Sequence, residues 1–119
     1  MKPIIIQNSK IPQRLSIFIN IGAITLYPFI ISRGEMDETT INHEKIHLAQ
    51  QRELWLIGFY LLYVYFWLKS ILKGKSSLTA YLDIPFEREA YHMQEDMEYL
   101  EKRPKQAWMR YLIYPHANP

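Results

Sequence analysis

The chain has 119 residues, a length typical of one domain, and 49% of them are apolar, which is enough for a hydrophobic core. Its 14 basic and 12 acidic residues are dispersed and give a net charge of +2, so we expect no nucleic-acid-binding surface. The sequence has no cysteine, which excludes disulfides and thiolate metal sites. Its first residues lack the long apolar segment of a secretory signal. We therefore expect a single domain over 1–119 in the cytoplasm.

The N-terminal third is predicted to form a small antiparallel sheet. Residues 3–6 are expected to form a short strand, and apolar residues alternate over 15–21, which is the period of a strand with one apolar face. Residues 22–23, Gly-Ala, suit a two-residue hairpin turn because glycine tolerates the first position of a type II′ turn. The β-forming residues over 24–31 supply the second strand of the hairpin. Pro28 has no N–H for a sheet hydrogen bond, so this strand is expected at a sheet edge or with a bulge.

Three to four helices are predicted after the sheet. Asp37 is a suitable N-cap for a first helix that begins near residue 38 and extends into the fifties, because a capping carboxylate accepts from free backbone N–H groups. A second helix is expected after a bend near Gly58, and it ends before Gly74. A loop is expected over 73–79.

The second helix carries the most apolar stretch of the chain, because residues 54–68 are all apolar, glycine or tyrosine. A helix that spans a bilayer needs about 20 such residues, so the stretch is short for a span. We favour a core helix that also forms a homodimer interface, since apolar runs of about 10 to 14 residues are usually buried. The alternative is contact of 54–72 with a membrane surface.

A third helix is predicted over about 85–102, with Asp83 as N-cap and Pro85 in the first turn, where proline is tolerated. Apolar residues recur along it at spacings of four and three, so they form one stripe that we expect to pack against the first two helices. These residues are Phe86, Ala90, Met93, Met97 and Leu100. Pro104 ends the helix, and 105–113 are expected to form a short final helix.

The first predicted helix contains the sequence His43-Glu44-Lys45-Ile46-His47. Residues four apart lie on one face of a helix, so the two imidazoles can bind one Zn²⁺. Glu44 lies beside that metal without having to bind it, and it is placed to take a proton from activated water. This is the HExxH arrangement of the zincin metallopeptidases. The competing interpretation is a surface helix that happens to carry two histidines.

A catalytic zinc site needs a third protein ligand, because such sites take three protein ligands and one water. Since cysteine is absent, the candidates downstream are carboxylates and histidines. They are Asp83, Glu87, Glu89, His92 and His116.

Residues 87–90, Glu-Arg-Glu-Ala, begin 40 residues after His47 and resemble the second zinc helix of the gluzincins. In that group a Glu-x-x-Ala sequence follows HExxH on a later helix, and its glutamate is the third ligand. The order of elements is also similar, so the chain resembles a minimal zincin of this clan. The resemblance implies an α+β fold, a small antiparallel sheet packed on three to four helices. It implies Glu87 as the third ligand. A helical wheel places Glu89 nearer the apolar stripe than Glu87, so Glu89 is the alternative ligand or a partner of a ligand.

The resemblance further implies a zinc-dependent peptidase in which Glu44 is the general base. A peptide or protein substrate would add as an extra strand to the edge strand at 24–31. Many gluzincins place an Asp four residues after the ligand glutamate, whereas this chain has Tyr91, which supplies no charge to the first histidine. Candidate donors to the oxyanion are Tyr81, Tyr91, His92 and His116. The alternative functions are a non-catalytic, zinc-stabilised binding protein and a membrane-peripheral protein.

Overall fold

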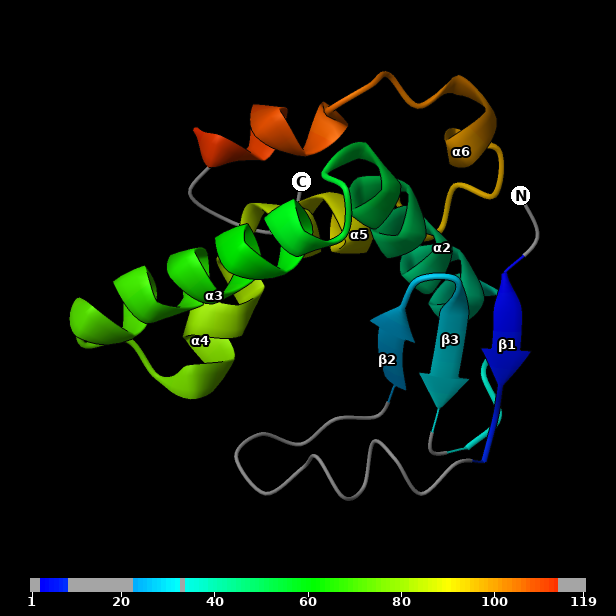
Figure 1. Ribbon diagram of the computed structural model, residues 1–119, viewed down its shortest axis with the longest axis horizontal. Helices are drawn as coiled ribbons and strands as arrows, with labels where there is room; N and C mark the ends of the chain where they lie inside the picture. Colours follow the sequence, from blue (N-terminus) through cyan, green and yellow to red (C-terminus); the bar gives the residue numbers. More distant parts are fainter. Residues whose placement is uncertain (1–2, 9–22, 33, 114–119) are drawn as a thin grey trace.

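The computed structural model describes residues 3–8, 23–32 and 34–113, and within them the fold is α+β, as expected (Figure 1). The strands are β1 (Ile4–Ile6), β2 (Ala23–Leu26) and β3 (Phe29–Ser32). The helices are α2 (Glu38–Glu53), α3 (Ile57–Leu72), α4 (Ser77–Leu82), α5 (Pro85–Met93), α6 (Tyr99–Lys102) and the 3₁₀ helix η1 (Ala107–Leu112). The sheet lies on one side of the molecule, and α3 and α4 extend away from it on the other side.

The sheet is mixed, so the prediction of an antiparallel sheet is wrong for one of its two strand pairs. The strand order is β1–β3–β2. β2 and β3 are antiparallel, with Leu26 opposite Phe29, whereas β1 runs parallel to β3, with Ile4 opposite Phe29. The strand predicted over 15–21 lies outside the described residues. Ala23, predicted to be in a turn, begins β2.

The single strand predicted over 24–31 is two strands joined by a turn at Tyr27 and Pro28, whose peptide bond is cis. Proline cannot continue the hydrogen-bond ladder of a strand, and the chain reverses there instead. The carbonyl oxygen of Pro28 accepts from the backbone N–H of Ile4 at 2.9 Å, and this contact helps to seat β1 beside β3. β3 is therefore central rather than an edge, and among the described strands only β2 and β1 lie at the sides of the sheet.

The helix that carries the HExxH sequence begins as predicted. The Asp37 carboxylate accepts from the backbone N–H of Thr40 at 2.8 Å and caps α2. The bend that follows α2 lies at 54–56 and not at Gly58, which is inside α3. Trp55 and Leu56 have positive φ angles of 57° and 61° there, and the axes of α2 and α3 differ by 112°.

The chain between α3 and α5 differs from the prediction at both ends. The loop expected over 73–79 is shorter, because the Ser76 side chain accepts from the backbone N–H of Thr79 and caps α4. Asp83 does not cap α5. It directly follows α4, and Ile84 is the N-cap residue of α5.

The helix predicted over 85–102 is interrupted, and η1 replaces the α-helix predicted over 105–113. The side-chain amide of Asn42 on α2 donates to the carbonyl oxygens of Gln94 at 2.8 Å and Asp96 at 3.1 Å. These bonds satisfy carbonyl groups at the end of α5, which terminates at Met93. Met97, expected in the apolar stripe, consequently lies outside both helices and is 48% exposed.

Two apolar clusters hold the helices together. One cluster joins α3, α5 and η1 through Phe59, Ile84, Phe86 and Trp108. The other joins α2, α5 and α6 through Ile46, Ala90 and Tyr99. The packing of the third helix against the first two, which the apolar stripe predicts, is thus present for Phe86 and Ala90.

We expect Phe86→Ala to lower the free energy of unfolding by about 3–5 kcal/mol, the usual cost of removing a buried aromatic ring. The Phe86 ring is fully buried, with the Phe59 and Trp108 rings at centroid distances of 4.6 and 4.8 Å. Urea unfolding followed by circular dichroism measures the loss. Phe29→Ala is the control, because that ring is 37% exposed, and it should cost much less. Equal losses would contradict this core.

Among the described residues, no single helix is long and apolar enough to cross a membrane. α2 and α3 reach that length and hydropathy only as a pair, across the bend between them.

Candidate metal centre

Two side chains of α2 and one of α5 converge at a buried point between the helices. His43 Nε2 and His47 Nε2 lie 3.1 and 3.0 Å from Glu87 Oε1, and 3.1 Å from each other. All three residues are at least nine-tenths buried. Ligand atoms around a tetrahedral zinc with bonds of about 2.0–2.1 Å lie about 3.3 Å apart. The separations therefore fit the coordination of one cation.

The hydrogen bonds of Gln50 determine which nitrogen of His47 faces this point. Gln50 Nε2 donates to the carbonyl oxygen of Phe86 and to Glu89 Oε1, both at 3.0 Å. Since both of these partners are acceptors, the other end of the amide, Oε1, faces His47 Nδ1 at 2.7 Å. The proton of a neutral His47 ring therefore lies on Nδ1, and Nε2 presents its lone pair towards Glu87.

His43 has an equivalent arrangement, because its Nδ1 lies 2.9 Å from Gln94 Oε1. Two imidazole lone pairs and one carboxylate oxygen thus meet at one buried point. Three acceptors at such distances repel one another unless a cation or a proton lies among them. A donor set of two nitrogens and one oxygen is one that Zn²⁺ accepts, so the residues present fit a metal ion.

The charges at this point shift two pKa values. Burial lowers the pKa of His47, but the Glu87 carboxylate outweighs burial and raises that pKa to about 9. Burial also acts to raise the pKa of Glu87, and the two histidines outweigh it and hold this pKa well below its ordinary range. At neutral pH a proton therefore occupies the site when no metal does.

We expect the zinc affinity to rise about tenfold per pH unit between pH 6.5 and about 9, because binding must displace the His47 proton. Because the pKa of His47 is higher in the folded protein than in the unfolded chain, protonation of His47 stabilises the metal-free fold. This stabilisation is complete below pH 6.5 and is lost as the pH rises through about 9. The melting temperature of the metal-free protein should thus fall over this pH range. The rise in melting temperature that added zinc causes should become larger over the same range. Competition with a chromophoric chelator measures the affinity, and a pH-independent value would contradict the assignment.

Glu44 lies beside the three converging residues and outside their ligand set. It is buried, and its Oε2 accepts a hydrogen bond from the Thr25 hydroxyl on β2. Its negative charge is one of the causes that raise the pKa of His47. The carbonyl oxygen of Thr25 in turn accepts from Gln51 Nε2 at 2.8 Å and from the Tyr60 hydroxyl at 3.1 Å. The sheet therefore contributes to this site by holding Glu44.

Sequence reasoning missed four residues around the site. Tyr63 on α3 donates its hydroxyl to Glu87 Oε2 at 2.7 Å, and its pKa is raised by burial and by Glu87. The others are Gln50, Gln94 and Thr25. Only Gln50 carries a local signal, because it lies three residues after His47 on the same helix.

Glu89, the alternative ligand, does not join the histidines. Its carboxylate accepts from the Tyr99 hydroxyl at 2.7 Å and from Arg103 Nη2 at 3.0 Å, and it is fully buried. Through Gln50 it instead supports His47. The structure thus brings Glu87, and not Glu89, to the two histidines.

Tyr91 does not accept from the His43 imidazole, since Gln94 occupies that position. The Tyr91 ring packs edge-on against His43 at a centroid distance of 4.5 Å, and its hydroxyl lies 2.9 Å from the Tyr81 hydroxyl. Burial is the main cause that raises the pKa of Tyr81 and of Tyr91, and the charge of Glu87 adds to it.

The remaining predicted site residues lie elsewhere. His92 is exposed, and its Nδ1 lies 2.7 Å from the Tyr111 hydroxyl on η1. Asp83 pairs with Lys75 and Arg88. His116 lies outside the described residues. His92 and Asp83 therefore take no part in this centre.

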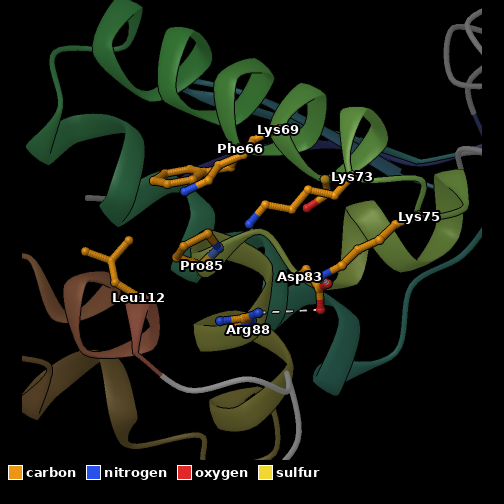
Figure 2. Close-up of a pocket in the computed structure, with 9 residues that line it drawn as sticks. Phe66, Lys69, Lys73, Lys75, Asp83, Pro85, Arg88 and Leu112 are labelled. Atoms are coloured by element: carbon orange, nitrogen blue, oxygen red, sulfur yellow. Dashed lines mark hydrogen bonds and ion pairs between the residues drawn. The ribbon is translucent and has the colours of Figure 1, made fainter.

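Two hollows in the described part of the molecule lie away from the metal centre. One, of about 180 Å³, is lined by residues of α3, α5 and η1 (Figure 2). The other has a volume of about 910 Å³, and its lining residues include Ile41, Lys45 and Leu48 of α2. His43 and His47 of the same helix do not line it. Neither hollow opens onto His43, His47 and Glu87.

The described residues include one buried group that can hold a metal ion, and it consists of His43, His47 and Glu87. Comparison of the chain with protein-family models, with curated proteins and with solved structures finds no match.

Proposed function

We propose that the protein is a zinc-dependent metallopeptidase of the gluzincin type. The observation that carries the proposal is the meeting of His43 Nε2, His47 Nε2 and Glu87 Oε1 within 3.1 Å of one another, with Glu44 buried beside them. When bound there, zinc supplies a Lewis acid that polarises a carbonyl group and makes water acidic near neutral pH. The side chains around it determine where protons go.

Glu44 is the proton carrier in this proposal. The Thr25 hydroxyl holds one of its carboxylate oxygens, so the carboxylate is oriented before substrate arrives. It accepts a proton from the attacking water and delivers it to the leaving amine. Tyr63 and the amides of Gln50 and Gln94 keep the three ligand side chains in place.

Tyr81 and Tyr91 are the proposed donors to the developing oxyanion. Because their pKa values are raised by burial and by the charge of Glu87, both hydroxyls remain protonated at neutral pH and can donate. A peptide substrate would pair with the outer side of β2, where it would have to replace Gln51 and Tyr60 at the Thr25 carbonyl oxygen. A peptide on β2 would pass close to Thr25, which holds Glu44.

A second candidate is a non-catalytic protein in which zinc stabilises the fold. The burial of the three ligand residues favours it. A structural zinc site needs no access for a substrate.

Cleavage of an unfolded protein such as reduced, alkylated casein tests the two candidates. The peptidase predicts cleavage by zinc-loaded protein, loss of cleavage after treatment with a chelator, and recovery when zinc is returned. If zinc binds with one ion per chain and no cleavage of casein or of a quenched-fluorescence peptide mixture occurs, the structural candidate is favoured.

A further inference from the structure

Helix α3 is apolar on the side that faces away from the core as well as on the side that faces it. Its inner side carries Phe59 and the partly buried Tyr63 and Phe66 of the first apolar cluster. The outer side presents a stripe of aliphatic and aromatic side chains, each between 45% and 86% exposed, at helical spacing along the whole helix. We name it the α3 stripe. It consists of Ile57, Leu61, Val64, Tyr65, Leu68 and Leu72.

Two further exposed apolar side chains lie close to the ends of this helix in the sequence. Trp55, in the bend before α3, is 88% exposed, and Leu78, on α4, is 67% exposed. A surface helix normally carries polar residues on its outer side. Apolar side chains that continue over about 24 Å of helix, at 1.5 Å per residue, indicate a surface that contacts something apolar.

Basic side chains predominate around the α3 stripe. The sequence has no acidic residue from 54 to 82, whereas Lys69, Lys73 and Lys75 lie at or just beyond the C-terminal end of α3 and are all exposed. Figure 2 shows these lysines around the smaller hollow, where Asp83 pairs with Arg88 and with Lys75. Four basic side chains and one carboxylate line that hollow, so it attracts anions.

We propose that α3 docks flat on an anionic phospholipid surface, with the α3 stripe in the acyl boundary and the lysines at the phosphate groups. A helix with one apolar side and flanking lysines is the form that binds such an interface. Trp55 and Tyr65 add rings of the type enriched at the level of lipid headgroups. The proposal concerns the outer side of α3, and it stands whether or not the metal centre is catalytic.

A lipid surface fits these observations better than a second copy of the chain. A second copy would have to bring carboxylates to the lysines, and the stretch from 54 to 82 that forms the stripe contains none. An anionic bilayer supplies both the apolar layer and the negative charge. The experiment must therefore distinguish binding of α3 to a lipid surface from a homodimer through α3.

Sedimentation of the full-length protein with vesicles tests the proposal, using phosphatidylcholine alone or mixed with phosphatidylglycerol. We expect stronger binding to the mixed vesicles, weakening as salt is raised. Each lysine near an anionic surface strengthens binding about fivefold, so Lys69→Gln with Lys73→Gln should weaken binding to mixed vesicles about 30-fold. Leu61→Gln with Leu72→Gln should weaken it about 100-fold or more, since each leucine loses its burial.

Matched controls use residues of the same kind away from α3. Lys102→Gln with Lys105→Gln, and Met97→Gln with Met109→Gln, alter exposed positions and should leave vesicle binding within about twofold of wild type. Emission from Trp55 provides an independent readout, because this side chain is exposed whereas Trp67 is partly buried and Trp108 is buried. We expect a blue shift on binding that Trp55→Phe removes.

Two results would overturn the proposal. One is equal sedimentation with both kinds of vesicle, or no effect of either α3 double substitution. The other is the finding that the protein binds no vesicles and is a dimer in sedimentation equilibrium, and that Leu61→Gln with Leu72→Gln dissociates this dimer. Such a result would assign the α3 stripe to contact with a second copy. Circular dichroism of each variant verifies that α3 remains folded.

Discussion

Glu44→Gln is expected to lower kcat for peptide hydrolysis by about 10³-fold while leaving the zinc content at one ion per chain. Loss of a positioned general base costs about 10²–10⁴-fold. The glutamine has nearly the same shape, and its oxygen can still accept from the Thr25 hydroxyl that holds Glu44. The substitution therefore removes the proton acceptor and leaves the surroundings in place.

The measurement combines cleavage of a fluorogenic peptide with elemental analysis of the same samples. Glu95→Gln is the matched control, because that glutamate is exposed in the loop after α5, and both activity and zinc content should stay at the wild-type value. Wild-type activity in Glu44→Gln would remove Glu44 from the mechanism. Loss of zinc together with activity would indicate that Glu44 supports the metal rather than the proton transfer.

His47→Ala is expected to weaken zinc binding by about 10²–10³-fold. Zinc sites with four protein ligands bind with about 10–16 kcal/mol, so each ligand supplies about 2.5–4 kcal/mol. The substitution also leaves the Glu87 carboxylate buried without one of its two histidine partners. The zinc-dependent increase in melting temperature should therefore become small at zinc concentrations that saturate the wild type.

His92→Ala is the matched control for this experiment. His92 is also a histidine of the helical region, but it is exposed and pairs with Tyr111 on η1. Its replacement should leave the dissociation constant for zinc unchanged, as measured by chelator competition. Equal affinities of His47→Ala and wild-type protein would show that zinc, if bound, is held elsewhere.

The two experiments together separate the proposed functions. A metallopeptidase loses activity in both variants but loses zinc only in His47→Ala. A protein in which zinc only stabilises the fold loses stability in His47→Ala and is unaffected by Glu44→Gln.

Features set by neighbouring residues could be predicted from the sequence. The cap at Asp37, the start of α2 and the shared face of His43 and His47 follow from contacts within one helical turn. The choice of Glu87 came from a sequence resemblance, and the structure places its carboxylate against both imidazoles.

Tertiary structure alone decided the features that depend on which elements meet. β1 joins β3 in parallel, Asn42 binds the carbonyl groups at which α5 ends, and Thr25 reaches Glu44 from the sheet. In the same way, the apolar sequence of α3 could not say which side of the helix faces the core. These contacts join residues far apart in the chain, and no local periodicity or propensity encodes such a pairing.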